Sequence, residues 1–146
     1  MAQSVYVAGV GMTKFNKPGN HDPYPVFGAA AVRDALADAG VDYDVIQQAY
    51  AGYVYGDSTC GQKVLYEVGM TGIPVVNVNN NCSTGSSALF LARQAVESGA
   101  VDCALAVGFE QMQRGALSSH WDDRTSPFES FDEKTAELVG HDELPL

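Results

Sequence analysis

The sequence predicts an α/β fold with a mostly parallel sheet. Runs of β-branched residues alternate with segments whose apolar residues recur every three or four positions, and glycine or proline separates them. The predicted order over residues 1–112 is βαβαβαβ, an alternation that places helices on the faces of parallel strands. With 146 residues, of which 46% are hydrophobic and 18% charged, the chain has enough apolar content for a buried core.

Each element has its own local signals. The first helix is predicted to follow Asp22 as N-cap, with Pro23 in its first turn, and to stop at Gly40. Two further helices are predicted at residues 62–70 and 83–98. Four strands are predicted: a β-branched run at residues 4–11, a continuous buried strand at 46–55, a strand with a period of two at 74–79, and a fourth strand at 101–109.

The pattern changes after residue 112. Residues 118–146 mix charge, proline and aromatic residues without a sustained period, so we expect no regular element there. We therefore divide the chain into an α/β unit at residues 1–112 and the incomplete start of an irregular loop domain at residues 113–146. We expect the chain to end inside a loop region of a longer protein.

Charge and cysteine content exclude several classes of function. Eight basic and eighteen acidic residues give a net charge of −10, which disfavours non-specific binding to nucleic acid or anionic membranes. No apolar run approaches the about eighteen residues of a membrane span, and no targeting segment is visible. Three dispersed cysteines fit neither a disulfide framework nor a zinc site. We expect a soluble, cytoplasmic protein without a bound metal.

The residues that carry chemistry lie at 75–89, where a strand runs through an asparagine corner into Cys82 and then a helix rich in small residues. A cysteine at a helix N-terminus meets the positive end of the helix dipole, which favours the thiolate. Backbone N–H groups of the first turn can bind a developing oxyanion, and small side chains leave room for an acyl group. A buried apolar role is commoner for any one cysteine; Cys103 fits that role, whereas Cys60 stays ambiguous.

Ordered motifs along the chain carry a family resemblance. The sequence NNNCSTGSSA at residues 79–88 resembles the nucleophile motif of the thiolase superfamily, most like its branch of sterol carrier protein-type thiolases and lipid-transfer proteins. Residues 5–15 are similar to the opening strand and turn of that branch, and residues 104–112 to the strand after the nucleophile helix. Residues 123–125, with the sequence DRT, fit the loop that follows. The resemblance covers essentially the whole chain.

The resemblance implies a thiolase-like acyltransferase acting on 3-ketoacyl-CoA or acyl-CoA in lipid or sterol metabolism. Cys82 would be its nucleophile and acyl carrier, and the Cys82 backbone N–H an oxyanion donor. Coenzyme A and acyl-CoA would be substrates, with no permanently bound cofactor. Met112 would lie near the pocket wall, and Arg114 and Arg124 are candidate substrate contacts. Glu110 and the asparagine run would buttress the corner.

The resemblance also implies that this chain is one half of a larger fold. Thiolases have two similar βαβαβαβ halves in a five-layered αβαβα sandwich, and the chain resembles the first half. The family's general base and acid lie in the other half. His21, His120 and His141 stand in no matching context, and we expect them to be solvated surface residues. We do not expect this chain alone to turn over.

The strand predicted at residues 74–79 suggests association. It alternates apolar residues with asparagine and carries no charge, so it suits edge-to-edge pairing. In thiolases the equivalent strand pairs antiparallel with its twofold mate. We expect a homodimer or higher oligomer, or a complex with a complementary C-terminal half.

Two alternatives come from other classes of function. One is a thiolase-fold carbon–carbon lyase, a retro-aldolase acting on steroid side-chain CoA esters without depending on the cysteine. The other is a non-catalytic half that binds lipid or completes a partner chain.

Overall fold

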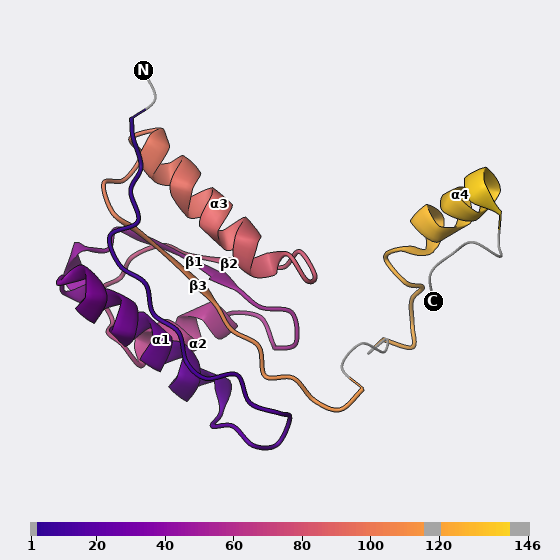
Figure 1. Ribbon diagram of the computed structural model, residues 1–146, viewed down its shortest axis with the longest axis horizontal. Helices are drawn as coiled ribbons and strands as arrows, with labels where there is room; N and C mark the ends of the chain where they lie inside the picture. Colours follow the sequence, from indigo (N-terminus) through magenta and orange to yellow (C-terminus); the bar gives the residue numbers. More distant parts are fainter. Residues whose placement is uncertain (1–2, 116–120, 141–146) are drawn as a thin grey trace. The chain divides into compact units, whose positions relative to one another are not determined.

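The computed structural model describes residues 3–115 and 121–140, which belong to a first unit at Met1–Arg114 and a second unit at Gly115–Leu146. The first unit contains a parallel sheet with helices on both faces (Figure 1). This confirms the predicted α/β class with its parallel sheet. No helix of the described residues is long and apolar enough to cross a membrane.

The sheet places its first strand at the centre. Ala49 of the central strand lies opposite Val75 on one side and Leu105 on the other. Each step to the next strand passes through a helix, as parallel neighbours require. The strands are β1 (Gln48–Gly52), β2 (Val75–Val78) and β3 (Ala104–Gly108), in the spatial order β2-β1-β3.

Two helices cover one face of this sheet and one helix covers the other (Figure 1). On the first face lie α1 (Tyr24–Ala39) and α2 (Cys60–Tyr66), and on the second α3 (Thr84–Glu97). A short 3-10 helix, η1 (Tyr43–Val45), connects α1 to β1. These helices correspond to the predicted ones, although α2 begins two residues and ends four residues earlier than expected.

Successive strand residues point to opposite faces of the sheet, and the two faces carry side chains of different size. Toward α1 and α2 the core is built from larger side chains, among them Val32, Ile46, Val64, Leu65, Leu105, Val107 and Phe109. Toward α3 the sheet presents Tyr50, Ala104 and Ala106, which contact a row of helix alanines at positions 88, 92 and 95. The alanines of α3 and those of β3 let this helix approach the sheet closely beside Tyr50.

The strand predicted at residues 4–11 is absent from the sheet, which corrects that expectation. Residues 3–17 are irregular, and the Val10 N–H donates to the Asp38 carboxylate of α1 at 2.8 Å instead of joining a strand. Gly9 lies directly on α1, where an added Cβ would come within 2.5 Å of the Ala35 carbonyl oxygen. A strand needs a neighbour with unpaired backbone groups, and these residues bind a helix instead.

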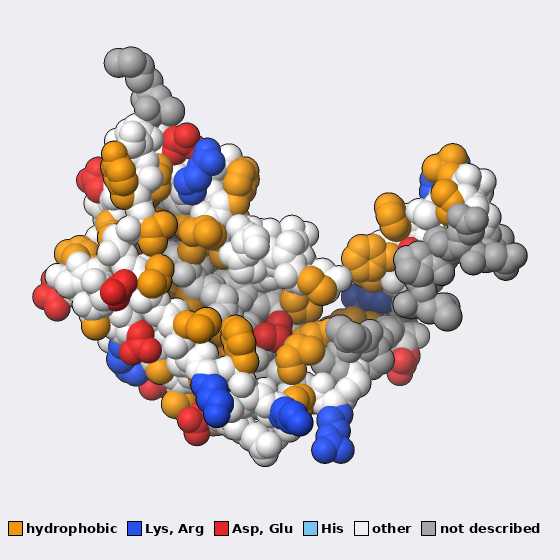
Figure 2. Space-filling model, in the orientation of Figure 1, with side chains coloured by type: hydrophobic (Ala, Val, Ile, Leu, Met, Phe, Trp, Pro, Cys, Tyr) orange, Lys and Arg blue, Asp and Glu red, His pale blue; other side chains and the backbone are white. Residues whose placement is uncertain are grey.

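This segment leaves several large apolar side chains exposed. Hydrophobic side chains accordingly lie scattered over the face of the first unit seen in Figure 2. The exposed ones of the segment are Tyr6, Val7, Val10, Met12 and Phe15.

The start of α1 is capped differently from the prediction. The prediction places Asp22 at the N-cap, but the N-cap residue is Pro23. Its side chain makes no hydrogen bond to the first turn of the helix. The Tyr24 N–H instead donates to the side-chain oxygen of Gln111 at 2.9 Å. Gln111 follows β3, so a residue distant in sequence replaces the local cap.

The second unit contains a helix where no regular element was expected. This helix is α4 (Glu129–Val139), and the prediction of a wholly irregular segment at residues 118–146 is wrong there. Glu129 and Asp132 lie in its first turn, where their negative charges interact favourably with the positive end of the helix dipole. Its apolar residues are few and mostly exposed, apart from the buried Ala136.

Candidate functional site

The polar corner that contains Cys82 connects the end of β2 to the start of α3. β2 ends at Val78 and α3 begins at Thr84, and the Cys82 side chain between them is exposed. Asn81 has a φ of 48°, in the left-handed region that asparagine tolerates better than most residues. The sharp turn presents the thiol on the surface at the carboxyl end of a parallel strand.

Thr84 and Ser83 hold this corner through hydrogen bonds. The Thr84 hydroxyl donates to the Asn81 carbonyl at 2.6 Å and accepts the Asn80 N–H at 2.8 Å. The Ser83 hydroxyl donates to the Asn80 carbonyl at 2.8 Å. The Asn80 side-chain amide reaches the Ser87 hydroxyl, also at 2.8 Å. The asparagine run therefore buttresses the corner, as the resemblance implied.

Two glycines at the ends of strands let the first turn of α3 pack closely against the sheet. An added Cβ on Gly52, the last residue of β1, would lie 2.9 Å from the Thr84 methyl group. An added Cβ on Gly108, the last residue of β3, would lie 3.5 Å from the Cα of Gly85. The first turn of α3 thus rests on the ends of both neighbouring strands, which fixes the position of the corner.

The three cysteines differ in accessibility. Cys82 is exposed, Cys103 is partly buried, and Cys60 is 3% exposed. The ambiguity over Cys60 is thereby removed, because an enclosed thiol at the start of α2 cannot meet a large substrate. Cys82 offers an exposed thiol beside the N-terminus of a helix of 14 residues, which is an arrangement suited to nucleophilic attack.

Cys60 instead belongs to an aromatic cluster at the same edge of the sheet. Its N–H donates to the Tyr53 hydroxyl at 3.2 Å. The rings of Tyr24 and Tyr53 stack on either side of Phe109, with centroids 5.4 and 5.3 Å from it. Burial, reinforced by a hydrogen bond with the Cys60 side chain, raises the pKa of Tyr24 to about 12. Both phenols therefore stay protonated at neutral pH, and their rings pack against Phe109.

Glu110 was expected to buttress the Cys82 corner, but its hydrogen bonds hold the loop that follows β1. Its carboxylate accepts the N–H groups of Val54 and Tyr55 at 2.8 and 3.0 Å. Together with Gln111, which caps α1, it ties the end of β3 to two other elements.

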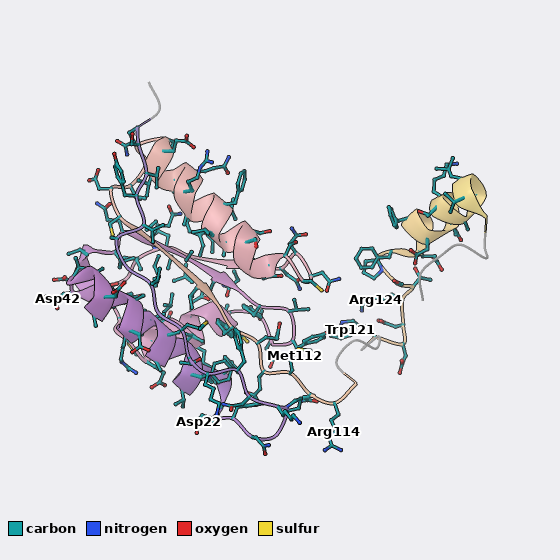
Figure 3. The ribbon with its side chains drawn as sticks, in the orientation of Figure 1. Asp22, Asp42, Met112, Arg114, Trp121 and Arg124 are labelled. Atoms are coloured by element: carbon teal, nitrogen blue, oxygen red, sulfur yellow. The ribbon has the colours of Figure 1, made fainter. Side chains whose placement is uncertain are left out.

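The remaining predicted site residues lie in irregular chain. Met112 and Arg114 follow β3, and both side chains are exposed (Figure 3). Arg124 lies in the second unit, where its guanidinium binds Asp123 through two hydrogen bonds of 2.6 and 2.8 Å. It also stacks 5.0 Å above the ring of Trp121. This pairing lowers the pKa of the Asp123 carboxyl and raises that of Arg124.

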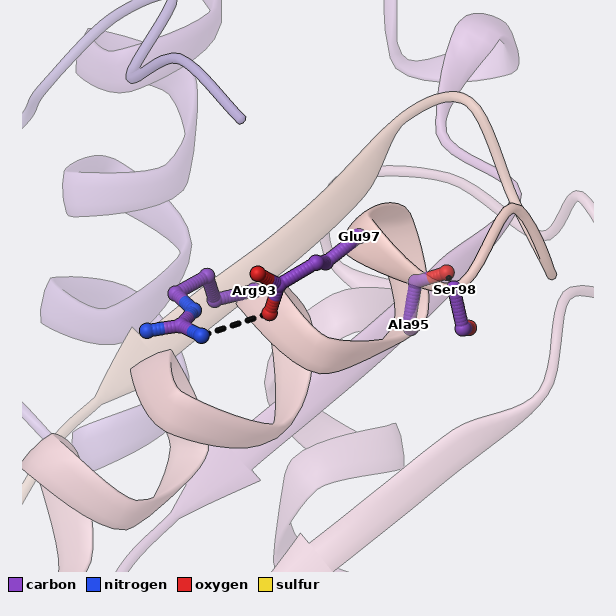
Figure 4. Close-up of polar contacts among 4 residues, drawn as sticks. All are labelled: Arg93, Ala95, Glu97 and Ser98. Carbon is purple, nitrogen blue, oxygen red and sulfur yellow. Dashed lines mark hydrogen bonds and ion pairs between the residues drawn. The ribbon is translucent and has the colours of Figure 1, made fainter. Parts of the chain in front are cut away.

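Other basic residues are engaged in local contacts. Arg93 pairs with Glu97 at 2.5 Å on the exposed side of α3, four residues along the helix (Figure 4). Lys134 pairs with Glu137 at 2.5 Å on α4. Surface pairs of this kind contribute little to stability and build no phosphate pocket.

The histidines supply no base beside Cys82 in the described residues. His21 is half-buried rather than solvated, with Nδ1 2.8 Å from the Asp22 carbonyl and its ring edge-on to Phe27. The expectation of a solvated residue is therefore wrong for His21. His120 and His141 lie outside the described residues.

Sequence reasoning named Cys82 but missed Thr84. A threonine two residues after a cysteine, at the first position of a helix, is a common N-terminal residue and carries no signal of its own. Its role becomes visible only when β1 and the asparagine corner are placed around it.

Comparisons with known proteins agree with this geometry. The family model described as "Thiolase, N-terminal domain" matches residues 5–142. Sterol carrier protein 2 of Gallus gallus is 56% identical over 131 residues, covering 88% of this chain and 24% of that protein. A benzoylsuccinyl-CoA thiolase subunit of Thauera aromatica is 39% identical over 113 residues, covering 75% of this chain and 29% of that subunit.

A solved structure with the same fold is 3-oxoacyl-(acyl-carrier-protein) synthase III of Aquifex aeolicus. It superposes with a TM-score of 0.59 at 18% identity, covering 81% of this chain and 38% of the synthase. The present chain spans about a quarter of the length of the sterol carrier proteins that it matches.

Proposed function

Because the chain belongs to the thiolase family, and matches the N-terminal domain of that family over residues 5–142, we propose that it is the N-terminal part of an acyl-CoA acyltransferase with Cys82 as nucleophile. One observation carries this proposal: the exposed thiol stands at the corner between β2 and α3, beside the N-terminus of the helix. The relative named a thiolase supports the same chemistry.

The proposed step is the transfer of an acyl group from coenzyme A to the protein. The Cys82 thiolate attacks the thioester carbonyl, and the carbonyl electron pair moves onto oxygen. The Cys82 N–H donates a hydrogen bond to that oxyanion. When the carbonyl re-forms, the carbon–sulfur bond to coenzyme A breaks and coenzyme A leaves as a thiolate. The product is an acyl-Cys82 thioester, and the proton that left the Cys82 thiol ends on the thiol of the released coenzyme A.

Substrate contacts remain part of the proposal. We propose Met112 at the pocket wall and Arg114 as the contact for a phosphate of coenzyme A. Arg114 is an exposed residue of the irregular chain that follows β3, and it extends away from the sheet (Figure 3). Arg124 is a weaker candidate for the same role because Asp123 and Trp121 already occupy its guanidinium.

Groups outside these 146 residues complete the proposed reaction. We propose residues 1–112 as the α/β half and residues 113–146 as the start of a loop domain, with the general base and acid in a complementary half. Substrates of the whole protein are 3-ketoacyl-CoA or acyl-CoA of lipid or sterol metabolism. The three cysteines are free thiols, as expected for the cytoplasmic location that we propose.

A lipid-binding role is the second candidate. The sterol carrier protein relatives favour it, because their name describes carriage rather than catalysis. In a non-catalytic half, Cys82 would form no acyl intermediate. A retro-aldolase acting on steroid side-chain CoA esters would cleave its substrate without the thiol.

Acylation by acetyl-CoA separates these candidates. We expect one acetyl group on the protein by intact mass, located on Cys82 by peptide mass spectrometry. Cys82→Ser should remove this label while leaving the far-ultraviolet circular dichroism spectrum unchanged, because serine is nearly isosteric. Cys103→Ser is the matched control and should keep it.

Two outcomes would contradict the acyltransferase proposal. Wild-type protein that remains unacetylated, yet binds a fluorescent fatty acid, would favour the lipid-binding role. A Cys82→Ser variant that cleaves a steroid side-chain CoA ester at the wild-type rate would favour the retro-aldolase.

A further inference from the structure

Thr84 stands apart from the other polar residues of the first unit. It is 5% exposed, and it is the one polar or charged residue that is buried among the described residues. Its methyl group lies over Gly52, at a point where an added Cβ would come within 2.9 Å. Because threonine is β-branched, fixing the methyl group against β1 also fixes the direction of the hydroxyl.

The hydroxyl is used both as donor and as acceptor. It accepts the Asn80 N–H at 2.8 Å and donates to the Asn81 carbonyl at 2.6 Å. The Thr84 N–H donates to the same carbonyl at 3.1 Å. The Asn81 carbonyl is therefore held by two donors of one residue, and both face the start of α3.

The Asn81 carbonyl belongs to the peptide group that also contains the Cys82 N–H. A trans peptide is planar, and its C=O and N–H point in opposite directions. No cis peptide occurs among the described residues. Holding the Asn81 carbonyl toward the Thr84 hydroxyl and N–H thus aims the Cys82 N–H in the opposite direction, away from Thr84.

Without the hydroxyl, this peptide loses one of the two donors that hold its carbonyl. Only the Thr84 N–H, at 3.1 Å, then opposes rotation of the peptide group between Asn81 and Cys82. That rotation changes ψ of Asn81 and φ of Cys82 while the rest of the corner keeps its place. The Cys82 N–H would then point elsewhere, although the thiol would remain exposed.

We propose that Thr84 is a positioning residue, whose hydroxyl orients the Cys82 N–H as an oxyanion donor. This inference rests on the proposed function, in which that N–H stabilises the tetrahedral intermediate. It goes beyond the function by assigning the orientation of the donor to one side chain that never touches the substrate.

The test compares two reactions of Cys82 that do not require coenzyme A. Acylation by p-nitrophenyl acetate passes through an oxyanion, whereas alkylation by iodoacetamide does not. Both rates are read on the Cys82 peptide by mass spectrometry. Thr84→Val replaces the hydroxyl by a methyl group of similar size, and we expect its acylation rate to fall at least about tenfold. We expect its alkylation rate to match that of the wild type.

Rescue and control variants complete the design. Thr84→Ser keeps the hydroxyl and should recover most of the acylation rate. Thr135→Val is the matched control, because the Thr135 hydroxyl makes a comparable 2.8 Å bond to the Phe131 carbonyl on α4. If Thr84→Val does not fold, Thr84→Ser and Thr84→Ala form a second pair that also differs by the hydroxyl alone.

The outcomes separate this inference from the proposed function. Equal acylation by Thr84→Val and the wild type would overturn the inference, as would a parallel loss of both reactions, which would indicate lost access to the thiol. Acetyl-CoA is assayed alongside. Wild type that reacts with p-nitrophenyl acetate but not with acetyl-CoA would refute the proposed function, and the role of Thr84 would still be decided by the variants.

Discussion

At the scale of single residues, the aromatic cluster beside Cys60 shows how burial changes acid–base behaviour. Tyr24 and Tyr53 stack on Phe109, and the Tyr53 hydroxyl donates to the Asp57 carbonyl at 3.0 Å. Burial disfavours the charged phenolate and raises the pKa of both tyrosines, that of Tyr24 to about 12. The free energy of unfolding should therefore depend on pH in the alkaline range.

The first prediction concerns that dependence. Above about pH 10 an unfolded tyrosine loses its proton. Folded Tyr24 retains its proton up to about pH 12, so the folded state binds more protons across this interval. The free energy of unfolding should therefore fall as the pH rises from 10 to 12. Urea unfolding at several pH values, with tyrosinate absorbance at 295 nm, measures this.

Tyr24→Phe is the informative variant for this prediction. It removes the late-ionising phenol, so the unfolding free energy should fall less steeply over the same interval. Tyr6→Phe, at an exposed position, is the control and should behave as the wild type. An unchanged slope in Tyr24→Phe would show that other groups cause the alkaline loss of stability.

At the scale of elements, two glycines occupy equivalent positions but meet different surroundings. Gly61 and Gly85 are each the second residue of a helix, α2 and α3 respectively. An added Cβ on Gly61 would lie 2.5 Å from the Ala51 Cβ and from the Asn77 side-chain oxygen. An added Cβ on Gly85 would meet no atom within 4 Å. The close contact of α2 with the sheet therefore depends on glycine, whereas the fold of α3 does not.

The second prediction uses this matched pair. Gly61→Ala should lower the free energy of unfolding by about 1–3 kcal/mol, because the added methyl group would overlap the Ala51 Cβ, which cannot rotate away. Gly85→Ala should leave it unchanged or raise it by up to about 1 kcal/mol, since alanine loses less chain entropy. Urea unfolding followed by circular dichroism compares them. Equal changes in the two variants would contradict the packing argument.

At the scale of the whole molecule, the sheet leaves β2 at one edge. The order β2-β1-β3 gives β2 a single neighbour, and its sequence VVNV carries no charge. Val76 of this strand is 36% exposed. An uncharged edge strand offers unpaired N–H and C=O groups to another chain, and a twofold axis would place the same strand on both sides. We therefore propose self-association through β2.

The third prediction is that the protein is not a stable monomer. Sedimentation velocity at micromolar concentration should show a dimer or a larger species. Val76→Lys places a charge on the edge and should shift the protein toward the monomer. Val26→Lys, at an exposed position on α1, is the control and should associate as the wild type does. A single folded species at the monomer mass for the wild type would refute the proposed association.

Local sequence patterns account for much of what the structure contains. The apolar runs around Tyr50, Val76 and Ala106 became strands, and the periodic segments between them became helices, because both patterns depend on neighbours a few positions apart. The corner at Cys82 was predictable for the same reason: a strand, a polar turn and a helix start follow one another directly along the chain. The prediction of an irregular segment missed α4 at residues 129–139, because this helix has few apolar residues.

Tertiary structure decided the features that need a distant partner. Residues 4–11 have a strand-like sequence, yet a strand exists only where another strand accepts its hydrogen bonds, and here Val10 binds Asp38 of α1. Gln111 caps α1 from 87 positions away, and Gly52 of β1 determines where the Thr84 methyl group lies. The sequence by itself determined the three strands of the sheet, the helices α1, α2 and α3, and the nucleophile candidate Cys82 at the corner between β2 and α3. Long-range contacts determined the cap of α1, the sheet order and the position of the Thr84 methyl group, because no periodicity encodes which distant residue completes a contact.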